Sequence, residues 1–208
     1  MKKIPTLFTR GPDHLVTPLL TMGCQWVQRG EGEPTVKIDG SCCMLKDGFL
    51  YKRSSRKLTR QAKAQRRRCN DWLATIRDFK DPPNGWIPAQ PCFDPFTGHW
   101  PGWLIVGNGP EDQYHMEAFV NSAHLFKNET CELVGPTIRN NPYHMDKHLL
   151  WSHHIRLSLA PPPTDFDGLC LYLGQHLMEG IVWHHPDGRM AKSKRRDFGF
   201  EWPLKAQP

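Results

Sequence analysis

Two tight β-hairpins constrain the fold of this chain more than any other feature of its sequence. Asp47-Gly48 lies between the apolar runs 42–45 and 49–51, and Pro186-Asp187-Gly188 separates predicted strands at 179–184 and 189–194. An Asp-Gly pair between apolar runs is a strong hairpin signal. Because a hairpin joins antiparallel strands, we expect antiparallel sheets.

The remaining elements mix strands and helices without strict alternation. Further strands are predicted between 35 and 41, at 103–106 and at 130–134. Helical spacing of apolar residues predicts a helix over 59–79, a short helix over 112–121, and a helix that begins after Thr164 or Asp165. This pattern is typical of the α+β class.

Composition excludes several classes of protein. No run approaches 18 apolar residues, so no membrane-spanning helix and no membrane partner is expected. Hydrophobic residues make up 38% of the chain, which is sufficient for a core and argues against general disorder. The first residues lack the apolar run of a signal peptide, so we expect a cytoplasmic protein. Seven cysteines without a CxxC pair predict reduced thiols rather than disulfides or a zinc ribbon.

Positive charge is concentrated in one short stretch. Between residues 49 and 70 the chain carries no acid and one third of its 27 Lys and Arg residues, namely Lys52, Arg53, Arg56, Lys57, Arg60, Lys63, Arg66, Arg67 and Arg68. Two interpretations remain open, a solvated helix face or a surface that binds a polyanion such as a phosphate backbone.

Three short patterns carry residues suited to chemistry. Lys37 stands at the end of a predicted strand, two residues before Asp39, and a strand lysine in such a turn can act as a nucleophile. Glu132 lies in a strand that ends at a glycine. Glu179 begins the last hairpin, whose second strand presents Lys192 and Lys194 on one face, and this combination of a carboxylate and two lysines is compatible with a phosphate and metal site. Each pattern alone also fits a solvated turn or hairpin face.

The order of these patterns resembles a known superfamily. KIDG, ELVG, EGIVW and KSK follow one another as in the covalent nucleotidyltransferases, which include ATP-dependent ligases and mRNA capping enzymes. The segments KIDGSCC, WIPA, GHWPGW, ELVGPTIRNNPY and 179–203 are similar to the RNA ligases typified by the vertebrate RNA ligase 1 family. The similarity extends in patches over residues 20–203.

The resemblance implies an ATP-dependent RNA ligase that joins 5′-phosphate and 3′-hydroxyl ends in three steps. A lysine attacks the α-phosphorus of ATP and releases pyrophosphate. The resulting lysyl-AMP transfers AMP to a 5′-phosphate RNA end, and a 3′-hydroxyl then displaces AMP. Magnesium or manganese neutralises the phosphates in such a reaction.

The resemblance also implies roles for individual residues. Lys37 is the implied nucleophile, and Glu179, Lys192 and Lys194 complete the implied catalytic set. The implied nucleotide-binding residues are Thr35, Val36, Lys37, Asp39, Gly40, Arg53, Glu132, Glu179, Lys192 and Lys194. The implied metal ligands are Glu132 and Glu179. Arg53 matches the family arginine that contacts the nucleotide or the RNA phosphate.

Two features depart from the wider superfamily. Many ligases carry a glutamate that helps to read adenine immediately before the nucleophilic lysine, where this chain has Val36. Only 36 residues precede Lys37 and 14 follow Lys194, so we expect one nucleotidyltransferase domain over 1–208 without an OB domain. RNA is the implied partner, and an accessory RNA-binding subunit remains open.

Other functions also remain open after this comparison. A DNA nick ligase or a GTP-dependent capping guanylyltransferase shares the same order of motifs. A catalytically silent relative that only binds nucleic acid is a third alternative.

Overall fold

The structure, a computed structural model, describes residues 4–69, 71–122 and 128–203. It is an α+β protein whose sheets are antiparallel, as the hairpins predicted. The chain divides into two compact units. Among the described residues, unit 1 comprises 41–69, 71–122, 128–135 and 145–152, and unit 2 comprises 4–40, 136–144 and 153–203. The expectation of one nucleotidyltransferase domain stays a prediction, and each unit is described by itself.

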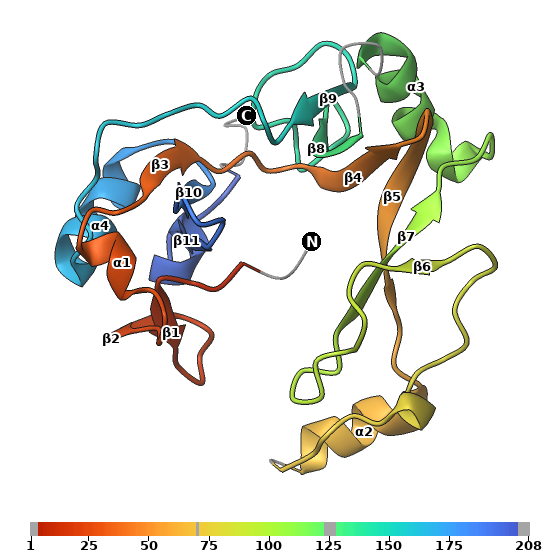
Figure 1. The fold of residues 1–208 in the computed structure, drawn as a ribbon, viewed down its shortest axis with the longest axis horizontal. Helices are drawn as coiled ribbons and strands as arrows, with labels where there is room; N and C mark the ends of the chain where they lie inside the picture. Colours follow the sequence, from red (N-terminus) through yellow and green to blue (C-terminus); the bar gives the residue numbers. More distant parts are fainter. Residues whose placement is uncertain (1–3, 70, 123–127, 204–208) are drawn as a thin grey trace. The chain divides into compact units, whose positions relative to one another are not determined.

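Unit 2 is built on a three-stranded sheet in the order β11-β10-β3 (Figure 1). Strands β10 (Gly180–His184) and β11 (Met190–Lys194) form the predicted last hairpin, and β3 (Glu33–Val36) pairs with the other edge of β10. A smaller hairpin of β1 (Phe8–Arg10) and β2 (Val16–Leu20) completes the strands of this unit.

Helices α1 (Gln25–Gln28) and α4 (Phe166–Gln175) lie on the same side of this sheet (Figure 1). Asp165, one of the two predicted caps, begins α4 because its carboxylate accepts a hydrogen bond from the Gly168 amide at 2.8 Å. The core of unit 2 joins both helices to one sheet face and consists of Leu7, Phe8, Cys24, Trp26, Val27, Leu169, Leu173, Ile181, Trp183 and Ala191.

Unit 1 is built on a six-stranded sheet in the order β6-β7-β5-β4-β8-β9. Its strands are β4 (Ser41–Lys46), β5 (Phe49–Arg56), β6 (Ile87–Pro88), β7 (Trp100–Ile105), β8 (Glu129–Val134) and β9 (Leu149–Ser152). The predicted hairpin between β4 and β5 is confirmed, with Lys46 opposite Phe49. Asp47 and Gly48 both adopt positive φ angles, of 52° and 80°, as a tight hairpin turn requires. Helix α3 (Gln113–Ser122) packs on β9.

The predicted helix over 59–79 is wrong in its second half. Helix α2 covers Arg60–Arg68 and ends at Cys69, whose backbone is extended. The chain then returns through a 3₁₀ turn, η1 (Ile76–Asp78), and the Thr59 amide donates to the Asp78 carbonyl oxygen at 2.8 Å. This return buries Phe79 beside Leu58 but leaves Ile76 half exposed. Phe79 and Trp72 therefore pack on this core through a chain reversal and not through one helix face, whereas Leu73 and Ile76 stay exposed.

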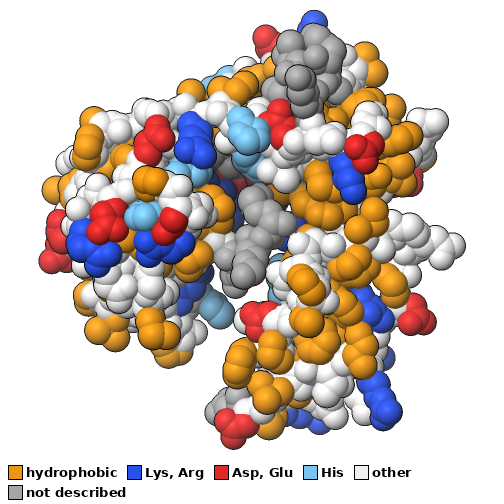
Figure 2. All heavy atoms as spheres, viewed as in Figure 1, with side chains coloured by type: hydrophobic (Ala, Val, Ile, Leu, Met, Phe, Trp, Pro, Cys, Tyr) orange, Lys and Arg blue, Asp and Glu red, His pale blue; other side chains and the backbone are white. Residues whose placement is uncertain are grey.

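The surface of unit 2 carries charges of both signs. Acidic, basic and histidine side chains lie close together over the part of this unit that carries α1 (Figure 2). Ion pairs such as Arg29 with Glu31, and Arg189 with Asp187 at 2.7 Å, are exposed, and such pairs contribute little to stability. All seven cysteines are free thiols. Across the described residues, no helix has the length and apolar character needed to cross a bilayer.

Candidate active site

Lys37 and the two lysines of β11 meet on one face of the unit 2 sheet. The Lys37 amide donates to the Gly180 carbonyl oxygen at 2.9 Å, and Gly180 is the register partner of Lys194. Gly180 is required there, because a Cβ at this position would lie 2.0 Å from the Ser193 carbonyl oxygen. Gly180, the first residue of β10, therefore lies between Lys37, which follows β3, and Lys194, the last residue of β11.

Glu179 bridges two of these lysines. Its Oε2 accepts a hydrogen bond from Lys37 Nζ at 2.5 Å, and its Oε1 accepts one from Lys194 Nζ at 2.7 Å. The carboxylate is buried, with 5% of the residue exposed, so these contacts are shielded from water. Unlike the exposed pairs near α1, this arrangement fixes both ammonium groups in place.

Lys192 adds a third positive charge to the cluster. It pairs with Val182 on β10, and alternation along β11 puts it on the same sheet face as Lys194. Burial, followed by the charges of Lys194 and Lys37, lowers the pKa of Lys192 to about 8. The cluster therefore gathers three lysines on one sheet face, with Glu179 as the carboxylate in contact and with Asp39 and Asp197 as further negative charges nearby. Lysine side chains gathered in this way are suited to contact a phosphate group.

The turn after Lys37 is held by three residues that the sequence patterns did not single out. The Asp39 amide donates to the Tyr143 hydroxyl oxygen at 2.6 Å, and Trp202 Nε1 donates to Asp39 Oδ2 at 3.0 Å. Arg139 Nε lies 3.7 Å from Asp39 Oδ1 and donates to the Gly40 carbonyl oxygen at 3.3 Å. Burial, together with the negative charge of Glu179, raises the pKa of Asp39.

The two predicted residues before Lys37 lie on opposite faces of the sheet. Thr35 is buried and donates its hydroxyl to the Val182 carbonyl oxygen at 3.1 Å. Val36 is the partner of Ile181, which belongs to the core under the helices. Register partners share a sheet face, so the side chain of Val36 lies on the face opposite to the lysines.

The other two predicted site residues, Arg53 and Glu132, belong to unit 1. Arg53 on β5 stacks on Trp103 with 4.8 Å from Cζ to the ring centroid, and burial lowers the pKa of its guanidinium. Glu132 on β8 is the partner of Cys42 on β4. Because Lys52 pairs with Cys43, the next residues, Arg53 and Cys42, share the other face of the sheet. Arg53 and Glu132 therefore lie on the same face of the unit 1 sheet.

The described residues contain no group of three or more His, Cys, Asp and Glu side chains arranged to hold a metal ion. The two predicted metal ligands, Glu132 and Glu179, belong to different units. Magnesium at nucleotide sites normally takes one or two carboxylates and completes its shell with waters and substrate phosphates. Glu179 offers one such carboxylate beside three lysines, and in this structure both of its oxygens accept hydrogen bonds from Lys37 and Lys194.

The family model and the relatives that match this chain share one description. A family model described as RNA ligase 1 matches residues 104–207, half of the chain. A Danio rerio protein named RNA ligase 1 is 26% identical over 222 residues, and the match covers 82% of this chain and 68% of the relative. Proteins of the same name from Pongo abelii and Rattus norvegicus are 29% and 28% identical, over the same shares of each chain.

Proposed function

Because the chain belongs to the RNA ligase 1 family, we propose that it is an ATP-dependent ligase that joins 5′-phosphate and 3′-hydroxyl RNA ends. The observation that carries the proposal is the contact of Lys37 and Lys194 with the buried carboxylate of Glu179, beside Lys192. A nucleophilic lysine and a fixed set of cations are what transfer of a nucleotidyl group requires.

In the first proposed step, Lys37 Nζ attacks the α-phosphorus of ATP. A P–N bond forms, the bond to the bridging oxygen breaks, and pyrophosphate leaves with the electron pair. Lys37 must lose one proton to become the attacking amine and a second as the P–N bond forms, and Glu179 Oε2, at 2.5 Å from Nζ, is positioned to accept one of them. The same contact aims Nζ at the face where the phosphate binds.

Lys192 and Lys194 hold the α-phosphate in this proposal. Their positive charges stabilise the negative charge that spreads over the phosphoryl oxygens in the transition state. A divalent cation held by Glu179 and the nucleotide phosphates would further neutralise the pyrophosphate that leaves. The contacts of Asp39 with Tyr143 and Trp202 keep the turn after Lys37 in one conformation, so the nucleophile does not need to reorganise.

In the later proposed steps the chain acts on RNA. AMP moves from Lys37 to the 5′-phosphate oxygen of one RNA end, and the amine of Lys37 is released. The 3′-hydroxyl of the other end then attacks that 5′-phosphorus, and AMP leaves. Arg53 and Glu132 are proposed, from the resemblance, to contact the nucleotide or the RNA during these steps.

Nucleotide labelling tests the first step. The full chain is incubated with magnesium and either α-labelled ATP or α-labelled GTP, and label is sought on the denatured protein. We expect label from ATP, and a linkage that acid breaks and alkali leaves intact, because the bond is P–N. Lys37→Arg should remove the label, because a guanidinium stays protonated. Lys46→Arg, at an exposed lysine of the β4–β5 hairpin, is the matched control and should label like the parent.

Label from GTP alone would instead favour a capping-type enzyme. Strong labelling of Lys37→Arg would contradict the assignment of the nucleophile. Sealing of 5′-phosphate RNA, compared with 5′-hydroxyl RNA and with nicked DNA, then tests the proposed substrate.

A further inference from the structure

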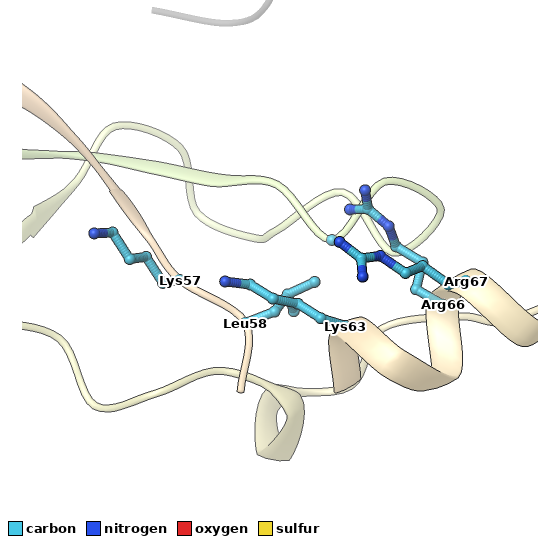
Figure 3. Close-up of a pocket in the computed structure, with 6 residues that line it drawn as sticks. Lys57, Leu58, Lys63, Arg66 and Arg67 are labelled. Carbon is cyan, nitrogen blue, oxygen red and sulfur yellow. The ribbon is translucent and has the colours of Figure 1, made fainter. Parts of the chain in front are cut away.

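A basic cavity lies in unit 1. Its lining includes none of the residues to which the proposed chemistry assigns a role. Its volume is about 340 Å³, and it is lined by Lys57, Leu58, Lys63, Arg66, Arg67 and Gly98 (Figure 3). That volume is at the lower end of the range for ligand pockets in proteins.

The helix α2 supplies three of the four cations. Thr59 caps its first turn by accepting a hydrogen bond from the Ala62 amide at 3.1 Å. Arg66 and Arg67 follow Lys63 by three and four residues, which puts the three side chains on neighbouring positions of one helix face. Lys57 comes from the segment between β5 and α2, and its side chain extends to the same side of the helix as the other three (Figure 3).

The walls of the cavity are closely packed. Leu58 is buried, and Gly98 faces it with a φ of 59°. A Cβ at Gly98 would lie 2.8 Å from Leu58 Cδ1, so the loop approaches the cavity this closely only with glycine. Arg66 Nη1 ties the loop to α2 by donating to the Thr97 carbonyl oxygen at 2.7 Å. Leu58 and the Gly98 loop therefore form a packed wall, and the four exposed cations lie around it.

The positive charge of the cavity is not balanced by the described part of the chain. No acidic side chain among the described residues forms an ion pair with Lys57, Lys63, Arg66 or Arg67. Asp94, in the loop beside Thr97, uses its carboxylate to accept hydrogen bonds from the Phe96 and Thr97 amides and from the Thr97 hydroxyl. Four uncompensated cations around one cavity repel each other, and an anionic ligand relieves that repulsion.

We propose that this cavity binds phosphate groups of the RNA strand. The inference rests on the proposed function, which makes RNA the substrate, and it adds a second contact region that lies outside the lysine cluster of unit 2. Arg and Lys are the usual partners of nucleic-acid phosphates. The lining contains no aromatic ring, amide or carboxylate that would stack on a base or read its edge, so the site holds the backbone and selects no sequence.

The phosphate can belong to the backbone or to the 5′ end, and the experiment distinguishes these sources. The full chain carries Lys37→Ala in every sample, so that no covalent step disturbs the binding measurement. The cavity variant is Lys63→Ala with Arg67→Ala. The flanking variant is Arg60→Ala with Arg68→Ala, which removes the same charge from the same helix outside the cavity. Binding of single-stranded RNA with a 5′-phosphate or a 5′-hydroxyl is measured against salt concentration.

We expect the cavity variant to lose two phosphate contacts. The slope of log affinity against log salt should become shallower by about 1.4, and affinity at about 0.1 M salt should fall about 25-fold. The flanking variant should lose far less. An equal loss with both RNAs identifies backbone phosphates, and a loss confined to the 5′-phosphate RNA identifies the terminal phosphate.

Two results would overturn the proposal. One is a cavity variant that matches the flanking variant in affinity and slope, and the other is no binding of RNA before either change. Self-labelling with ATP, measured on the same variants with Lys37 intact, keeps the two proposals separate. Absence of label with retained cavity-dependent RNA binding refutes the ligase chemistry only, whereas parental labelling with unchanged RNA binding refutes the cavity only.

Discussion

Among single residues, Glu179 is the one that contacts both Lys37 and Lys194. One carboxylate oxygen accepts a hydrogen bond from Lys37 and the other accepts one from Lys194. The carboxylate is buried, so these contacts are shielded from water. Glu179→Gln keeps the shape but removes the charge. We expect the rate of self-adenylylation to fall about 10²–10³-fold, the usual cost of one electrostatic contact to a transition state.

Glu31→Gln is the matched control for this change. Glu31 is also an ion-paired glutamate of unit 2, but it is exposed and lies beside Arg29 and His185. Its variant should label at nearly the parental rate. Rates are measured at saturating ATP, with thermal unfolding as a check on folding. If Glu179→Gln labels as fast as Glu31→Gln, the bridge is structural only.

Lys192 predicts a pH dependence of stability. The pKa of Lys192 is about 8 in the folded chain and 10.5 for an unperturbed lysine. Between these values the unfolded chain binds more protons, so the free energy of unfolding rises with pH through this window. Below about pH 8 both states are protonated and the folded chain carries the full cost of the buried charge.

Lys192→Met removes this contribution. Relative to the variant, the parent should gain up to about 3 kcal/mol of unfolding free energy between about pH 8 and 10.5. Urea denaturation of both proteins at several pH values measures the difference. Parallel pH profiles for parent and variant would contradict the lowered pKa of Lys192.

At the scale of elements, the cap of α4 offers a clean test. Asp165 accepts the Gly168 amide, and without it the first turn of a helix that carries Leu169 and Leu173 into the core loses a hydrogen bond. Asp165→Ala should lower the free energy of unfolding by about 1 kcal/mol, whereas Asp165→Asn, which retains a capping oxygen, should change it little. Equal losses for the two variants would show that the capping bond contributes nothing.

At the scale of the whole molecule, the core of unit 2 joins segments that are far apart in the sequence. Leu7, Trp26, Leu169 and Ile181 pack in one cluster although more than 170 positions separate the first from the last. Leu169→Ala should therefore cost about 2–5 kcal/mol of unfolding free energy. Leu171→Ala, on the same helix but 63% exposed, should stay within about 0.5 kcal/mol. Thermal or urea unfolding measures the free energy of unfolding of both variants. Similar losses for the two variants would contradict the assignment of Leu169 to the core.

Local sequence was sufficient for the elements whose signals lie within a few residues. The turn at Asp47-Gly48, the hairpin that ends at Lys194 and a helix cap at Thr164 or Asp165 were all predicted, because turn and cap preferences act between near neighbours. The order of motifs likewise predicted that Lys37, Glu179, Lys192 and Lys194 belong together. The structure brings these four residues to one sheet face, while their chemical roles stay predictions.

Contacts between distant segments required the tertiary structure. The apolar spacing over 69–79 predicted a continuous helix, but the pairing of Leu58 with Phe79 reverses the chain instead. Arg139, Tyr143 and Trp202 lie within segments that resemble the family, yet only the fold shows that they surround Asp39. Periodicity reports which residues share a face of one element, and it contains no information on which other element covers that face. Which two elements pack together depends on the burial and hydrogen bonding that both elements gain. These gains involve segments far apart in the sequence, so only the folded chain shows them.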